Sequence, residues 1–88
     1  DIENDNFWAY AFPSPASSDM SINYNVVGHD NAAIRIMNAL GEVVMSFENL
    51  AQGQNTLRMD VSKLPAGSYF YQLRAGDAVM TKKFSVVR

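Results

Sequence analysis

Few side chains in this 88-residue chain could do chemistry, and they lie far apart. The single histidine, His29, offers one imidazole base and rules out a His-based metal cluster. A catalytic triad would need a serine beside it, and Ser14, Ser17 and Ser18 lie in a turn segment where hydroxyls normally bond their own backbone. Without Cys there is no thiolate nucleophile, thiolate metal site or disulfide. We predict no enzyme, and a solvated loop position for His29.

Carboxylates are the remaining candidates for metal ligands. Asp30 with Asp77, or the acids of residues 1–5, would bind calcium only if loops brought them together, and no DxDxDG-type sequence supports this. The five glycines are spread among separate turns, so no phosphate-binding loop is predicted. We therefore expect no metal, no cofactor and no small-molecule substrate.

Charge and hydrophobicity limit the partners and the compartment. The net charge of −2 is too small to indicate a nucleic-acid or anionic-membrane partner. No apolar run approaches the roughly 20 residues that span a bilayer. Because the chain begins DIENDNF, without an initiator Met or a signal peptide, we expect it to be a piece of a longer protein. Residues 1–6 are polar and acidic, as linkers are.

Strands are the elements that would position any site. Polar and apolar residues alternate with a period of two, and turn signals recur at intervals of roughly 8–12 residues. The expected strands are residues 7–12, 20–26, 33–37, 42–48, 55–61, 68–75 and 79–87. The pattern predicts an all-β domain over residues 7–88, a single antiparallel seven-stranded Ig-like β-sandwich.

The run Tyr69-Phe70-Tyr71 has two interpretations. Exposed aromatics could stack on sugars or bases, whereas tyrosines of a central strand usually fill the core with their hydroxyls at its edge. We favour the core. The residues expected inside are Trp8, Ile22, Tyr24, Val26, Ile34, Ile36, Val43, Met45, Leu57, Tyr69, Tyr71, Leu73 and Phe84. In the last strand this parity would turn Lys82 inward, so we expect a β-bulge near Thr81–Lys83.

Five motifs in order resemble one family. They are Pro13-Ser14-Pro15-Ala16, the I-x-I-x-N-x-x-G-x-V-V of residues 34–44, Leu64-Pro65-Ala66-Gly67-Ser68-Tyr69, Leu73 to Gly76, and Lys82 to Val87. Together they are similar to the type A C-terminal sorting domain of the type IX secretion system of Bacteroidota, over about residues 12 to 88. Two departures are Ser14, where the family usually has Asn, and Met37, where it has Tyr.

The resemblance implies a non-catalytic secretion signal. Such domains pass through the periplasm, engage the outer-membrane translocon, and are commonly removed by a sortase that attaches the cargo to the cell surface; other cargo is secreted. The sortase would read the stretch before the first strand, here Asp1, Ile2, Glu3, Asn4, Asp5 and Asn6. A polar, extended linker suits a protease.

The resemblance also assigns recognition to the last two strands and the terminus: Gly67, Tyr69, Gly76, Lys82, Lys83, Phe84, Val86, Val87 and Arg88. Lysines on an edge strand discourage aggregation, and the same strand could accept another from a translocon component. Export that survives deletion of residues 84–88 would contradict that hypothesis. An edge-strand dimer is left open. The alternative function is a carbohydrate-binding or adhesive module of a surface enzyme, marked by an exposed aromatic pair, with Trp8 a candidate.

Overall fold

The computed structural model describes residues 6–13, 16–28 and 31–88, and the regular structure in these ranges is all β-strand. The strands are β1 (Phe7–Phe12), β2 (Asp19–Val26), β3 (Ala32–Asn38), β4 (Val43–Leu50), β5 (Gly53–Asp60), β6 (Gly67–Ala75) and β7 (Ala78–Val86). The seven predicted strands are confirmed within a few residues at their ends, and the described ranges contain no helix.

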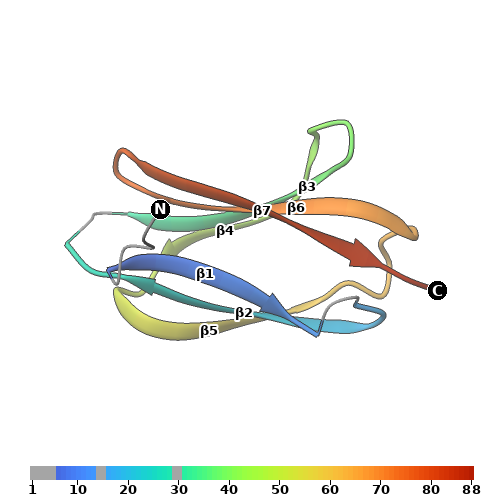
Figure 1. Cartoon of the computed structure of the whole chain (residues 1–88), viewed down its shortest axis with the longest axis horizontal. Helices are drawn as coiled ribbons and strands as arrows, with labels where there is room; N and C mark the ends of the chain where they lie inside the picture. The colour runs from blue at the N-terminus through green and yellow to red at the C-terminus, as the bar shows by residue number, and fades with distance from the viewer. Residues whose placement is uncertain (1–5, 14–15, 29–30) are drawn as a thin grey trace.

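The strands form two layers (Figure 1). One sheet has the order β1-β2-β5 and the other the order β4-β3-β6-β7, and all neighbouring strands are antiparallel. The predicted antiparallel β-sandwich is therefore confirmed. In a constant-type immunoglobulin domain the fourth strand joins the sheet of the fifth. Here β4 instead pairs with β3.

A tight turn keeps β4 beside β3. The backbone N–H of Asn38 donates to the Glu42 carbonyl at 2.9 Å, and the Asn38 side-chain oxygen accepts from the N–H groups of Leu40 and Glu42, both at 3.0 Å. Gly41 has a φ of 86°, the left-handed conformation that glycine adopts without strain. A connection this short returns the chain antiparallel to its own neighbour.

The core lies between the two inner faces. Along β2 the predicted core residues Ile22, Tyr24 and Val26 are buried, and Met20, which has the same parity, is buried with them. The other buried members of the predicted core are Ile34, Ile36, Tyr69, Tyr71, Leu73 and Phe84. Met45 and Leu57 are half-buried and pack against this cluster.

Trp8 was predicted inside and lies outside. It stands opposite Asn25 on the outward face of β1, whereas Phe7 and Ala9 face the core. The sequence FWAYAF is apolar at both parities, so alternation could not choose a face. The register with β2 makes the choice, because it sets Ala9 opposite the buried Tyr24.

Val43 was also predicted inside, and its side chain is 52% exposed. The register between β3 and β4 shifts between Ile36 and Met37, so that Ile36 faces Met45 while Met37 faces Val43. Val43 therefore lies beyond the shift, where the alternation of β4 no longer points it at the core.

The predicted bulge in the last strand is wrong. The register of β7 with β6 runs without a shift from the Ala75–Ala78 pair to the Gly67–Val86 pair, and Lys82 stays opposite Tyr71 on the inner parity. Since β7 is the last strand of its sheet, this inner position lies at the border of the sandwich. Lys82 is half-buried there, because the aliphatic stem of a lysine can lie along apolar surface at such a border.

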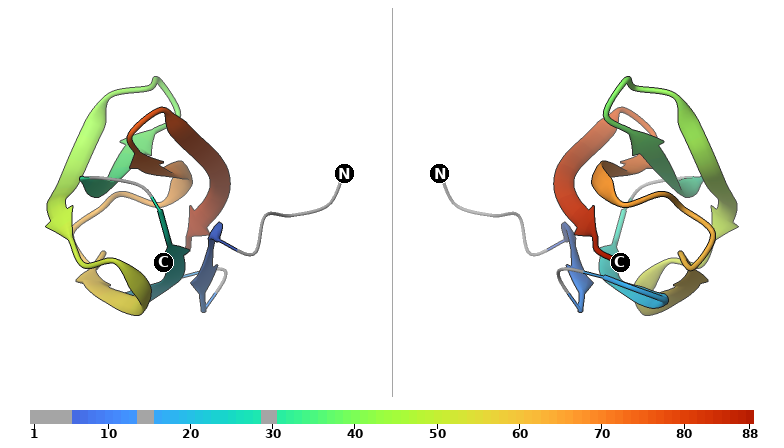
Figure 2. Two further views of the ribbon diagram at one scale, coloured as in Figure 1. Left: turned by 90° about the vertical axis from the view of Figure 1, so that its left-hand side faces the viewer. Right: turned by 90° about the vertical axis from the view of Figure 1, so that its right-hand side faces the viewer.

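Seen end-on, β7 lies beside β1 on one side of the sandwich and β4 beside β5 on the other (Figure 2). Two contacts join the layers at the β1–β7 side. The N–H of Ala11 in β1 donates to the Tyr71 hydroxyl at 3.2 Å. Beyond β1, Ala16 forms a parallel bridge with Val86. The C-terminal hairpin is thus held by residues from the beginning of the chain.

Candidate functional site

The β6–β7 hairpin carries most of the residues that the sequence singled out. Its turn is Gly76-Asp77, between the paired residues Ala75 and Ala78. Gly76 has a φ of 58° at the first central position, as a type II′ turn requires. The turn therefore sets the register of the whole hairpin, and with it the face on which each later side chain lies.

The inner face of the hairpin is an aromatic cluster. The rings of Tyr69 and Phe84 stack with centroids 5.6 Å apart, and Tyr71 is tilted against Phe84 at 6.1 Å. Tyr69 and Tyr71 are only 5% and 4% exposed, which confirms the core interpretation over a binding platform. The Tyr69 hydroxyl donates to the Pro65 carbonyl at 2.6 Å, so its polar end is satisfied at the rim.

In the other sheet, Tyr24 is likewise a buried tyrosine whose hydroxyl is hydrogen-bonded at the rim of the core. It is buried, and its hydroxyl donates to the Ala51 carbonyl at 3.2 Å. Burial raises the pKa of Tyr24, and the hydrogen bond to Ala51 opposes that shift. The buried tyrosines thus tie the sandwich to its loops and leave no phenol pair for ligand binding.

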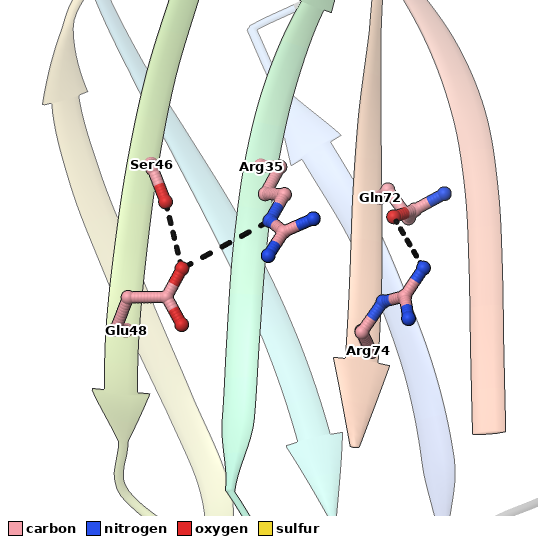
Figure 3. Close-up of polar contacts among 5 residues, drawn as sticks. All are labelled: Arg35, Ser46, Glu48, Gln72 and Arg74. Atoms are coloured by element: carbon pink, nitrogen blue, oxygen red, sulfur yellow. Dashed lines mark hydrogen bonds and ion pairs between the residues drawn. The ribbon is translucent and has the colours of Figure 1, made fainter. Parts of the chain in front are cut away.

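The outer face of the larger sheet is polar (Figure 3). Glu48 on β4 forms an ion pair with Arg35 at 3.9 Å and accepts from the Ser46 hydroxyl at 2.8 Å. Nearer β7, Arg74 donates instead to the neutral Gln72 amide oxygen at 3.5 Å. The acidic side chain lies at the β4 side of the sheet, and the β6–β7 side is basic.

The last residue, Arg88, is bound to backbone carbonyls of three segments. Its guanidinium donates to Val61 at 2.7 Å and to Ser62 at 3.0 Å, and also to Leu64, in the loop between β5 and β6. It donates as well to Ser17, in the connection from β1 to β2, and to Val87 at 3.3 Å. A planar cation with several fixed donors can satisfy such a cage of carbonyls.

Ala16 closes the outer edge of β7 near its end. Its N–H donates to the Ser85 carbonyl at 2.9 Å, and its carbonyl accepts from the Val87 N–H at 2.8 Å. Ala16 is fully buried. The end of β7 is therefore built into the sandwich between β6 and Ala16.

The nine residues assigned to recognition by resemblance fall into two groups. Tyr69, Phe84 and Val86 are buried in the core. The others are exposed or half-buried: Gly67, Gly76, Lys82, Lys83, Val87 and Arg88. Deleting residues 84–88 would therefore remove Phe84 and Val86 from the core, so this deletion cannot separate recognition from folding.

The stretch predicted for sortase cleavage lies mostly outside the described residues, as do Ser14, His29 and Asp30. Asn6 is exposed, and its carbonyl accepts from the Val27 N–H at 2.9 Å, one residue before β1 begins. Within ranges 6–13, 16–28 and 31–88, no group of acidic or histidine side chains could hold a metal ion, and no pocket opens.

Two features had no clear sequence signal. Nothing local marks Ala16 or the carbonyls around Arg88 as partners of the last strand, because 71 positions separate Ser17 from Arg88. A third feature had a partial signal: the sequence places Trp8, Tyr10 and Phe12 at one parity of β1, but the face on which this aromatic row lies could not be read from it. Tyr10 and Phe12 are 49% and 42% exposed.

The fold and the surface define a small all-β module that ends in a C-terminal hairpin with a buried inner face and an exposed outer face. The family model of the secretion system C-terminal sorting domain matches residues 10–87. The chain therefore belongs to this family, the C-terminal sorting domains of type IX secretion. No curated protein matches the chain. None of the described segments is a helix long and apolar enough to cross a membrane.

Proposed function

We propose that this domain directs the protein to which it belongs through the outer-membrane type IX translocon. The observation that carries the proposal is the family match over residues 10–87, since members of that family are type IX sorting signals. Such a signal implies contact with the secretion machinery and delivery to the cell surface or the medium. In this proposal the cargo reaches the translocon from the periplasm, and the domain itself is not catalytic.

We further propose that a sortase removes the domain by cutting within residues 1–6 and attaches the cargo to the cell surface. Support comes from the polar sequence DIENDN and from its place immediately before β1, which begins at Phe7. A cut there would leave the sandwich intact, because Phe7 is the first residue of the described fold with a buried side chain.

The test is export of a fluorescent cargo that carries a signal peptide and residues 1–88, in a Bacteroidota host. We expect fluorescence at the surface or in the medium, and periplasmic retention of the same cargo without the domain. Retention with the intact domain would overturn the sorting function. Sequencing the C-terminus of the exported cargo tests the sortase separately: an uncut fusion contradicts cleavage but not sorting.

The aromatic row of β1 supports a second candidate function, carbohydrate binding or adhesion. Trp8 and Tyr10 lie with ring centroids 5.5 Å apart at 19°, and Phe12 follows at 6.3 Å. The Tyr10 hydroxyl accepts from the Asn23 amide at 3.1 Å, so neutral polar groups adjoin the rings. Two results together would favour this function over sorting. The isolated domain would bind polysaccharide and lose that binding in Tyr10→Ala, and the export test would fail.

A further inference from the structure

The outer edge of β7 has backbone groups that point away from β6. In an antiparallel hairpin with a two-residue turn, the residues that flank the turn exchange both backbone hydrogen bonds, and every second residue after them faces outward. Counting from Ala78, the outward residues of β7 are Val79, Thr81, Lys83 and Ser85. The bond that the Ser85 carbonyl accepts from Ala16 fits this alternation.

This edge has a closed half and an open half. The closed half is Ser85–Val87, which pairs with Ala16 and is followed by the bound guanidinium of Arg88. The open half is residues 79–83. β7 is the last strand of its sheet, and within the described ranges no residue pairs with this part of its edge. Three consecutive outward positions are therefore available for strand pairing.

The open half is basic in an acidic domain. Between Gly67 and Val86 the hairpin has three cations, Arg74, Lys82 and Lys83, and one acid, Asp77 in the turn, whereas the whole chain has a net charge of −2. A second copy pairing through the same edge would bring two basic hairpins together. Like charges on neighbouring strands are unfavourable. A strand that carries acidic side chains would be complementary.

We propose that the edge of β7 at residues 79–83 accepts an extended, acidic segment of the export machinery, which adds to the sheet as a fifth strand beside β7. This inference rests on the proposed sorting function and names its contact surface. Backbone hydrogen bonds to the outward groups would give affinity. The positive charge of the exposed Lys83, at an outward position of this edge, would select an acidic segment, and Ala16 limits its reach toward the C-terminus.

The test is proline substitution at an outward position, Thr81→Pro. Proline removes an N–H that no backbone carbonyl of the described residues accepts from, and its ring blocks an incoming strand. The matched control is Thr81→Val, which keeps the N–H. Both variants lose the exposed hydrogen bond from Gln72 to the Thr81 hydroxyl at 3.3 Å. Export of the fluorescent cargo should fall by about tenfold or more in Thr81→Pro and stay near wild type in Thr81→Val.

Circular dichroism and thermal unfolding of both purified variants establish that each is folded. If Thr81→Pro proves unfolded, Lys83→Glu replaces it: reversal of this exposed charge should lower export through repulsion of the acidic segment, with no change of backbone. Normal export of a folded Thr81→Pro variant, or of Lys83→Glu, overturns the strand contact while the sorting function stands.

Two further outcomes overturn the inference in distinguishable ways. If sedimentation shows a wild-type dimer that Thr81→Pro abolishes, the occupant of the edge is a second copy. If the wild-type domain itself fails to export its cargo, the sorting function fails, and the contact surface fails with it.

Discussion

The two sides of the β6–β7 hairpin are built for different tasks. On the inner side, Tyr69, Tyr71 and Phe84 form one aromatic cluster that is nearly inaccessible to solvent. On the outer side and edge, Thr81 and Lys83 are exposed, and within the described ranges no strand is hydrogen-bonded to the outward groups of residues 79–83. A single stretch of sequence therefore holds the fold with alternate residues and offers a surface with the others.

The residues of the sorting motif lie on both sides of the hairpin, so substitutions in the motif can test two different properties. Tyr69 and Phe84, which the resemblance assigns to recognition, are buried, so a partner cannot contact them while the domain is folded. Substituting them tests whether the machinery needs a folded domain. Contact with the machinery is tested only by substitutions at the accessible positions, because those leave the core intact.

The largest effect is expected for Phe84→Ala. Phe84 is 3% exposed and contacts the rings of Tyr69 and Tyr71, so truncation should cost about 3–5 kcal/mol. That approaches the free energy of unfolding of a domain of this size, about 4–13 kcal/mol. Urea unfolding of the purified variant measures the loss, and Lys83→Gln, one residue away on the opposite face, should stay within about 0.5 kcal/mol of wild type.

Export of the same two variants tests whether the inner and outer sides of the hairpin have different functions. Normal export of an unfolded Phe84→Ala domain would mean that the machinery reads an extended sequence, and the inner and outer sides would then not differ in function. Loss of export with Phe84→Ala, together with reduced export of the folded Lys83→Gln variant, would mean that the machinery reads the folded outer surface of the hairpin.

A smaller effect is expected for Arg88→Met, which empties the carbonyl cage. Because the guanidinium donates hydrogen bonds to several carbonyls, its removal should lower the free energy of unfolding by about 1 kcal/mol. Hydrogen exchange should become faster at the amides of Ala16 and Val87, which form the closed half of the edge. The control is Arg74→Met on the outer face, and unchanged exchange at both amides would contradict a role for Arg88 in closing the edge.

The smallest effect concerns Asp60, which begins the loop around Arg88. Hydrogen bonds from the side chain and the N–H of Ser62, the latter at 2.8 Å, lower the pKa of Asp60, with smaller contributions from the charges of Lys63 and Arg88. A lowered pKa in the folded state means a stabilisation that is present above the ordinary value of 3.8 and lost as the pH falls through the folded value.

Urea unfolding of wild type and Asp60→Asn at pH 5 and at pH 2.5 tests this. The wild type should be the more stable of the two at pH 5, and the difference should shrink at pH 2.5. An equal difference at both pH values would show that the carboxylate charge does not contribute.

Much of the fold was predictable because it depends on local patterns. The alternation of β2 identified its buried residues, and Gly41 and Gly76 marked turns that need a left-handed glycine. Trp8 was mispredicted because both parities of β1 are apolar, and the bulge predicted near Thr81–Lys83 was wrong because an edge strand tolerates an inward Lys82.

By itself the sequence determined the seven strands, the turns between them and the family to which the chain belongs. These depend on residue types at short spacing, where a period of two or a glycine in a turn has a direct physical consequence. Only the tertiary structure decided which side of β1 faces the core, that Ala16 closes one half of the β7 edge, and that Arg88 binds the carbonyls of two distant loops. Such contacts join residues far apart in the chain, and they exist only once the two sheets have packed.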